Sequence, residues 1–153
     1  MLRISKLTDY GTVVLAHLAN PETNLASAAD VATATGVALP TVSKLLKALT
    51  RADLVKSTRG SQGGYELARR ATEISAAEII DALEGPVSIT ECSGSDSHCD
   101  FESVCSVGGA WQRINVAIRQ TLKNISLADL LPRNHAALRL QFAGMPIAVE
   151  TKN

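Results

Sequence analysis

The sequence is short of aromatic side chains, which make up 3% of its 153 residues, and it has no net charge, because 15 acidic residues balance 15 basic ones. No apolar run approaches the roughly 18 residues of a membrane span, and the N-terminus lacks the apolar block of a signal peptide. Apolar residues nevertheless reach 46%, which is enough for a packed core. We therefore expect a soluble, cytoplasmic protein of one domain, or of one small domain with an appendage, that contacts no membrane.

Catalytic signatures are also missing. The sequence holds no nucleophile–base pairing, no phosphate-binding loop that opens a helix and no pair of carboxylates placed for acid–base work. The three histidines, His17, His98 and His135, are scattered along the chain. These absences argue against an enzyme.

Charge is strongly segregated along the chain. Residues 1–70 carry nine Lys/Arg against five Asp/Glu, residues 71–110 carry eight acids and no Lys or Arg, and residues 111–153 carry six basic residues against two acids. A basic patch on a neutral protein indicates a polyanion partner, although a solvated helix face is the alternative interpretation. The basic residues of the expected patch are Lys44, Lys47, Arg51, Lys56, Arg59, Arg69 and Arg70.

A winged helix-turn-helix is predicted in the N-terminal half. After a first helix from about Thr8 to Ala19, with Thr8 as its N-cap, two short helices joined by a turn at Gly36 fill about residues 28–51. A strand, a glycine-containing turn and a return strand follow over about residues 54–68, and a hairpin placed directly after the second helix is a wing. The local signals are the capping-box pair Ser27 and Asp30, and Pro40 in the first turn of the second helix.

The C-terminal half contains two further helices. Ser75 and Glu78 form a second capping box, and Gly85 ends the helix that it starts. An apolar stripe recurs at helical spacing through Trp111, Ile114, Ile118, Leu122 and Ile125, which favours a partner helix across a dimer interface over packing within one chain. The predicted organisation is a mainly α winged helix-turn-helix domain over 1–85, a cysteine-containing loop over 86–108, a long dimerisation helix over 109–131 and a weakly ordered tail over 132–153.

The three cysteines, Cys92, Cys99 and Cys105, all lie in the predicted loop. Their spacing matches neither the C-x2-C repeat of a zinc site nor the C-x-x-C of a redox site. Three thiols on a loop suit an iron–sulfur cluster, which prefers sulfur ligands and normally needs four. His98 and Asp9 are candidates for the fourth ligand, and three free thiols without any ligand role remain the alternative.

Several pieces together resemble one family, the bacterial winged-helix regulators that sense iron–sulfur clusters (IscR/NsrR-like), and the opening Met1–Gly11 looks most like the regulator of the SUF assembly system. The matching pieces, which cover residues 1 to about 131, are Lys6–Gly11, the helix around Leu39–Leu49, the wing Ser57–Ala68, the run Ile79–Gly85 and the three-cysteine loop.

The resemblance implies a homodimer with crossing long helices and an iron–sulfur cluster near the interface. One branch of the family takes its fourth ligand from a histidine three residues after the last cysteine, where this sequence has Gly108. A second branch takes an aspartate from the partner's first helix, and Asp9 stands at the matching position. The implied ligands are Cys92, Cys99, Cys105 and the partner's Asp9, and the departure at Gly108 leaves both a 2Fe-2S and a 4Fe-4S cluster open.

In this interpretation the second helix of the motif enters the major groove and the wing tip reaches an adjacent minor groove of a roughly palindromic double-stranded site. The candidate DNA-binding residues are Thr41, Ser43, Lys44, Lys47, Arg59, Ser61 and Gln62. The predicted function is a repressor of iron–sulfur assembly genes that responds to cluster status. The alternatives are a nitric oxide- or redox-responsive repressor of the same family, a cluster-free regulator that senses oxidation through its thiols, and an iron–sulfur scaffold or electron carrier.

Overall fold

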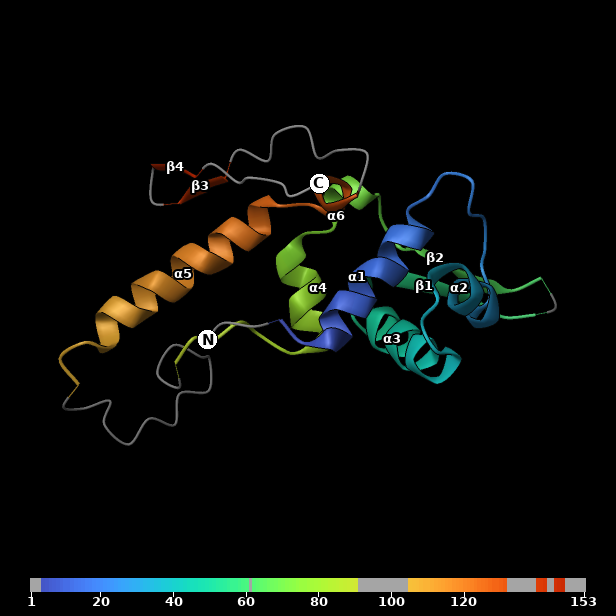
Figure 1. Cartoon of the computed structure of the whole chain (residues 1–153), viewed down its shortest axis with the longest axis horizontal. Coiled ribbons are helices and arrows are strands. Elements are labelled where there is room, and N and C mark those ends of the chain that lie inside the picture. Colours follow the sequence, from blue (N-terminus) through green and yellow to red (C-terminus); the bar gives the residue numbers. More distant parts are fainter. Residues whose placement is uncertain (1–3, 61, 91–104, 132–139, 143–144, 148–153) are drawn as a thin grey trace.

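The computed structural model describes residues 4–60, 62–90, 105–131, 140–142 and 145–147 (Figure 1). The helices in chain order are α1 (Lys6–Leu18), α2 (Ala28–Thr35), α3 (Leu39–Arg51), the short 3-10 helix η1 (Ala71–Glu73), α4 (Ala76–Leu83), α5 (Gly108–Asn124) and α6 (Leu127–Leu130). The strands are β1 (Val55–Thr58), β2 (Gly64–Leu67), β3 (Leu140–Phe142) and β4 (Met145–Ile147). In the described part of the chain, no helix is both long enough and apolar enough to cross a membrane.

The helix-turn-helix is confirmed as α2 and α3. Ser27 accepts from the backbone N–H of Asp30 while the Asp30 carboxylate accepts from the N–H of Ser27, so the predicted capping box is complete. Gly36 follows α2 at φ +72°, a left-handed conformation that favours glycine, and Pro40 lies in the first turn of α3. These local signals fix both ends of the motif.

The start of the first helix differs from the prediction. Helix α1 is capped by Ser5, whose hydroxyl accepts from the N–H of Thr8 at 3.3 Å, and Thr8 lies inside the helix rather than at its cap. Thr8 is 3% exposed, and its own hydroxyl donates to the Glu84 carboxylate. Helix α1 therefore begins earlier than predicted. Its first turn has no acid at the capping-box position, and the carboxylate of the distant Glu84 takes that place.

One apolar core joins α1, α3, α4 and the base of the wing. The fully buried side chains include Val14 and Leu15 of α1, Val31 of α2, the α3 residues Val42, Leu45, Leu46 and Leu49, and Ile74 and Leu127 near α4 and α6. Burial of each such side chain contributes about 1.5–3 kcal/mol to folding. The inner face of α3 is therefore held against this core, and its opposite face is left to solvent.

The wing is an antiparallel pair in which Val55 lies opposite Leu67. A third segment extends it, because the N–H of Tyr65 donates to the carbonyl of Ala26 at 2.8 Å and the N–H of Ala26 donates back to Tyr65 at 3.1 Å. Gly64 permits this approach, since a Cβ there would lie 2.9 Å from the backbone of Ala26. Strand β2 at the base of the wing thus has hydrogen-bonded neighbours on both edges, β1 on one and Ala26 on the other.

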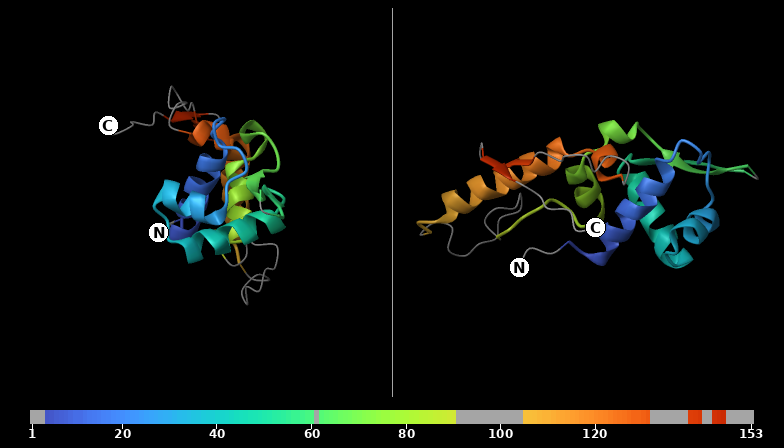
Figure 2. Two further views of the ribbon diagram at one scale, coloured as in Figure 1. Left: turned by 90° about the vertical axis from the view of Figure 1, so that its right-hand side faces the viewer. Right: turned by 45° about the horizontal axis from the view of Figure 1, so that its top comes forward.

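Helix α5 extends from the domain on the side opposite to the wing, as two views agree (Figures 1 and 2). Its C-terminal end is anchored by backbone hydrogen bonds from Ala76 to Ile125 at 2.8 Å and from Leu127 to Ile74 at 2.7 Å. Arg119 adds an ion pair with Asp81 of α4 at 2.8 Å.

The segment 132–153, for which the sequence predicts a weakly ordered tail, contains one short hairpin. Strands β3 and β4 pair there in antiparallel orientation, with Phe142 opposite Met145. Strand β3 contacts α5. The sequence signal is brief, the triplets Leu140-Gln141-Phe142 and Met145-Pro146-Ile147 on either side of Ala143-Gly144. The other residues of the predicted tail lie outside the described part of the chain.

Candidate nucleic-acid interface and cysteine ligands

The outer face of α3 presents most of the predicted DNA-binding residues together. Ser43, Lys44 and Lys47 are exposed, whereas Thr41 is half-buried. The valine and three leucines of the inner face are fully buried, so the polar residues of this helix point away from the core. Such a helix can place hydroxyl groups against base edges and ammonium groups against phosphates.

The wing tip carries the other predicted contacts. Arg59 and Gln62 are exposed, whereas Ser61 lies outside the described part of the chain. Gly60 has φ +118°, and a Cβ at Gly63 would overlap the carbonyl oxygen of Thr58, so the turn depends on glycine at both positions. The tip can therefore approach a polyanion closely, with Arg59 as its cation.

The basic patch is smaller than the sequence indicates. Arg69 pairs with Glu78 and Arg70 pairs with Glu73, each at 2.8 Å, and the Arg70 guanidinium holds the pKa of Glu73 below its usual value. Among the described residues, the ion pairs leave the cations of α3 and the wing without an acidic partner. The cations available to a phosphate backbone are Lys44, Lys47, Arg51, Lys56 and Arg59.

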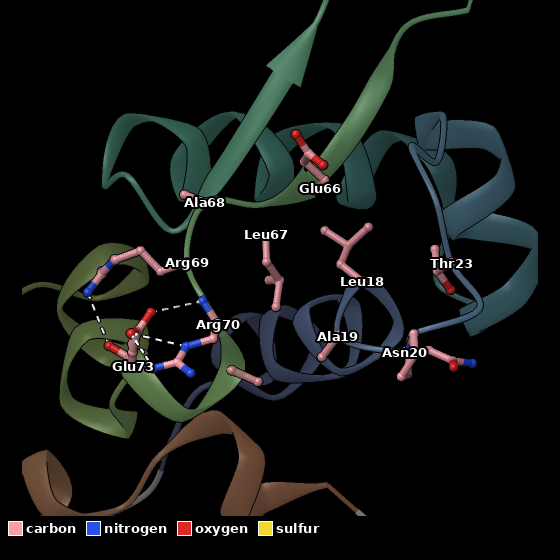
Figure 3. Close-up of a pocket in the computed structure, with 12 residues that line it drawn as sticks. Leu18, Ala19, Asn20, Thr23, Glu66, Leu67, Ala68, Arg69, Arg70 and Glu73 are labelled. Carbon is pink, nitrogen blue, oxygen red and sulfur yellow. Dashed lines mark hydrogen bonds and ion pairs between the residues drawn. The ribbon is translucent and has the colours of Figure 1, made fainter.

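A shallow hollow of about 660 Å³ lies at the base of the wing, between the end of α1 and the β2–η1 connection (Figure 3). Arg69 and Arg70 line it, and Figure 3 shows both engaged by neighbouring acceptors. The lining also includes the carboxylates of Glu66 and Glu73, which balance the two guanidinium groups, so the hollow offers an anion no net positive charge.

Only one of the predicted cysteine ligands lies in the described part. Cys105 is a half-buried free thiol that precedes α5. Cys92, Cys99 and His98 lie outside the described residues, and within those residues no three potential metal ligands come together. A Cβ at Gly108 would lie 3.7 Å from the Cys105 sulfur. Position 108 therefore faces this thiol without offering a ligand.

Asp9 is exposed in the first turn of α1. It lies on the rim of a groove of about 610 Å³ whose apolar wall is formed by α4, α5 and α6, including Ile79, Ile80 and Leu122. The carboxylate is therefore accessible from outside the chain, as a ligand donated to a second copy must be.

Sequence reasoning missed one residue of this region, Glu84. Its carboxylate accepts hydrogen bonds from the hydroxyl of Thr8 and, at 3.1 Å, from the N–H of Ser5. The hydrogen bond from Thr8, and to a smaller extent those from Ser5, hold the pKa of Glu84 below its usual value. The one available signal was a serine near the start of α1 with no acid three residues later.

A family model described as Rrf2, iron-dependent transcriptional regulator, matches residues 4–133 of this chain. The ORF2 protein of Azotobacter vinelandii, which bears the name of an HTH-type transcriptional regulator, is 34% identical over 134 residues, or 87% of this chain and 81% of that protein. The family and this relative are regulators rather than enzymes, in agreement with the missing catalytic signatures.

Two solved structures share the fold, with similar TM-scores and the same sequence identity to this chain. CymR of B. subtilis, described as its global cysteine regulator, superimposes with a TM-score of 0.65 at 30% identity, over 85% of this chain and 96% of that one. IscR of T. potens superimposes with a TM-score of 0.62 at 30% identity, over 84% of this chain and 85% of that one. The predicted winged-helix fold is confirmed by these matches.

Proposed function

The chain belongs to the Rrf2 family of transcriptional regulators, which bind DNA and are typically dimeric, and on this premise we propose that it represses iron–sulfur assembly genes according to cluster supply. The observation that carries the proposal is the presence of an exposed polar and basic face on α3 together with three cysteines in one chain that resembles cluster-sensing regulators. Such a repressor acts in the cytoplasm, where the chromosome is.

We assign DNA contacts to both the helix and the wing. Thr41 and Ser43 face base edges in the major groove, and Lys44 and Lys47 bind the flanking phosphates. Arg59 enters the adjacent minor groove, with Ser61 and Gln62 beside it. The two sets of contacts differ in role, because phosphate contacts position the protein and base contacts select the sequence.

The exposed apolar residues of α5 support a homodimer, which we place on a roughly palindromic operator. In the apolar stripe of this helix Trp111 is 41% exposed and Ile114 39%, which is unfavourable for a helix that stays in water. A second copy that covers these side chains also doubles the DNA contacts, and two-fold symmetry then requires paired half-sites.

The donor set fits an iron–sulfur cluster held by Cys92, Cys99 and Cys105, with the partner's Asp9 as fourth ligand. The soft thiolates suit iron and sulfide, and the free thiol of Cys105 and the accessible carboxylate of Asp9 agree with these roles. When bound, such a cluster supplies an iron- and oxidant-sensitive cross-link between its ligands. The chain's own part is to hold Cys105 next to the start of α5 and Asp9 at the start of α1.

Anaerobic purification tests the cluster assignment. We expect visible absorption, iron and sulfide in the wild-type protein, and their loss in Cys105→Ala with the thermal midpoint retained. Selection from a random duplex library then yields the operator, which cluster-loaded and cluster-free protein should bind with different affinities. Colourless, iron-free protein with unchanged operator affinity contradicts the proposal.

A second candidate is a cluster-free regulator that senses oxidation or cysteine supply. It is favoured by the similarity to a solved structure described as a cysteine regulator and by the half-buried free thiol of Cys105. In that case the anaerobic protein lacks iron, and mild thiol oxidation alone changes its affinity for the selected duplex.

A further inference from the structure

The cap of α1 is assembled from two distant segments. Oε1 of Glu84 accepts from the N–H of Ser5 and from the hydroxyl of Thr8, although Ser5 and Glu84 are 79 residues apart in sequence. The Ser5 hydroxyl in turn accepts from the N–H of Thr8. Helix α1 thus has the reciprocal hydrogen bonds of a capping box, with its acid supplied by the end of α4.

The other serine-capped helices in the described part of the chain take their acid from their own first turn. The local pairs are Ser27 with Asp30 in α2, Ser75 with Glu78 in α4 and Ser126 with Asp129 in α6. At the matching position α1 has Thr8, which carries no carboxylate. A local acid satisfies the same backbone donor. What the distant acid adds is a fixed position of the α1 start relative to the α4 end.

Glu84 lies where the chain leaves the DNA-binding domain for the cysteines. It is the C-cap residue of α4, and Gly85 turns the chain out of that helix at φ +89°. The next cysteine in the sequence, Cys92, follows after a short connection. A displacement of this connection acts first on the residue that caps α1.

Helix α1 passes that displacement on to α3. A Cβ at Gly11 would overlap Cδ1 of Leu83, the neighbour of Glu84, and would lie 3.4 Å from Cδ2 of Leu45. Leu45 is fully buried on the inner face of α3, and Lys44 beside it is exposed. Because interiors are closely packed, α1 cannot move against α4 without disturbing the packing under α3.

We propose that Glu84 is a positioning residue that couples the chain entering the cysteine segment to the DNA-reading helix α3 through its hold on α1. The inference rests on the proposed function, in that α3 is taken to read DNA. Without the Glu84 carboxylate, the first turn of α1 separates from α4 and α3 samples more than one placement against the core.

Three variants of the full chain separate positioning from stability. Glu84→Ala removes the distant acid, Asp129→Ala removes the local acid of α6 as a matched control, and Thr8→Glu with Glu84→Ala returns a carboxylate to α1 itself. We expect each single variant to lower the thermal midpoint by about 2–4 °C. The double variant should recover that loss, because its cap is local.

Affinity for the duplex selected by the wild-type protein gives the decisive readout. We expect Glu84→Ala and the double variant to bind at least about fivefold more weakly, and Asp129→Ala to stay within about twofold of wild type. Recovery of affinity in the double variant, or equal affinity in the two single variants, overturns the coupling. If the wild-type protein selects no duplex, the proposed function fails. Amide exchange in α3 then decides the inference, because exchange that is faster in Glu84→Ala than in Asp129→Ala supports the coupling and equal exchange overturns it.

Discussion

The DNA-binding domain and helix α5 differ in what surrounds their apolar residues. In the domain, Leu15, Leu45 and Leu46 are fully buried by neighbours from the same chain. In α5, Trp111 and Ile114 remain exposed, and the backbone hydrogen bonds and the ion pair that hold the helix to the domain are in its C-terminal half. The start of α5 also lacks the side-chain cap that α2 and α4 possess. The domain is therefore complete within one chain, whereas α5 has an apolar surface that a second copy would complete.

The largest expected effect is in the domain core. Leu46→Ala opens a cavity under α3 and should lower the free energy of unfolding by about 2–5 kcal/mol, as urea denaturation measures. DNA affinity should fall with it, since α3 loses its support. A loss below about 1 kcal/mol would contradict a core that is closed within one chain.

A charge on the exposed face of α5 should act on association instead. Ile114→Glu places a carboxylate within the apolar stripe that is the expected interface and should weaken dimerisation by at least about tenfold in sedimentation experiments. Arg113→Gln on the same helix, also exposed but outside the stripe, is the control and should leave the dimer intact. If Ile114→Glu does not change the association, this stripe of α5 is not the dimer interface.

A smaller effect is expected from the cations of α3. Lys44→Ala and Lys47→Ala should each reduce the slope of log affinity against log salt by about one, because each removes a phosphate contact. Arg70→Ala is the matched control, because its guanidinium already pairs with Glu73. An equal change in slope for all three variants would mean that the ion pairs do not define the interface.

The smallest effect concerns acid. The Ser27 side chain and backbone lower the pKa of Asp30 in the folded protein, so this cap stabilises α2 above the unfolded carboxyl pKa and is lost as pH falls through the lowered folded value. The protection of the amides at the start of α2, relative to their intrinsic exchange rate at each pH, should therefore fall below about pH 4. The start of α5, which has no side-chain cap, should show no such step. An equal acid transition in both helices would contradict this difference.

Sequence reasoning succeeded where the physical cause is local. The start of α2, its end at Gly36 and the face of α3 each depend on residues within one or two turns, which a pattern can reveal. It failed at α1, because the acid that completes the cap is Glu84, far along the chain. The basic patch was overestimated for two reasons. Arg69, in the β2–η1 connection, pairs with Glu78 of α4, whereas the pair of Arg70 with Glu73 is local and its spacing was already visible in the sequence.

The same distinction between local and distant causes applies to the residues of the candidate site. The exposed positions of Ser43, Lys44 and Lys47 follow from helical periodicity, and the structure agrees with them. The ligand assignments at Cys92, Cys99 and Asp9 depend on two chains and on a group that no periodicity specifies, so they stay predictions. Gly108 is informative in sequence and structure alike, because it withholds a side chain next to Cys105.

The pairing of β2 on both edges distinguishes the wing residues that the fold requires from those that can be substituted. The backbone pairing of Tyr65 with Ala26, which the absence of a side chain at Gly64 permits, ties the hairpin to the segment before α2, so substitutions at Gly64 disturb folding. The side chains of Arg59 and Gln62 are exposed at the wing tip. Substitution of these two side chains can therefore change the contacts that the wing tip makes, while the backbone that presents them keeps its structure.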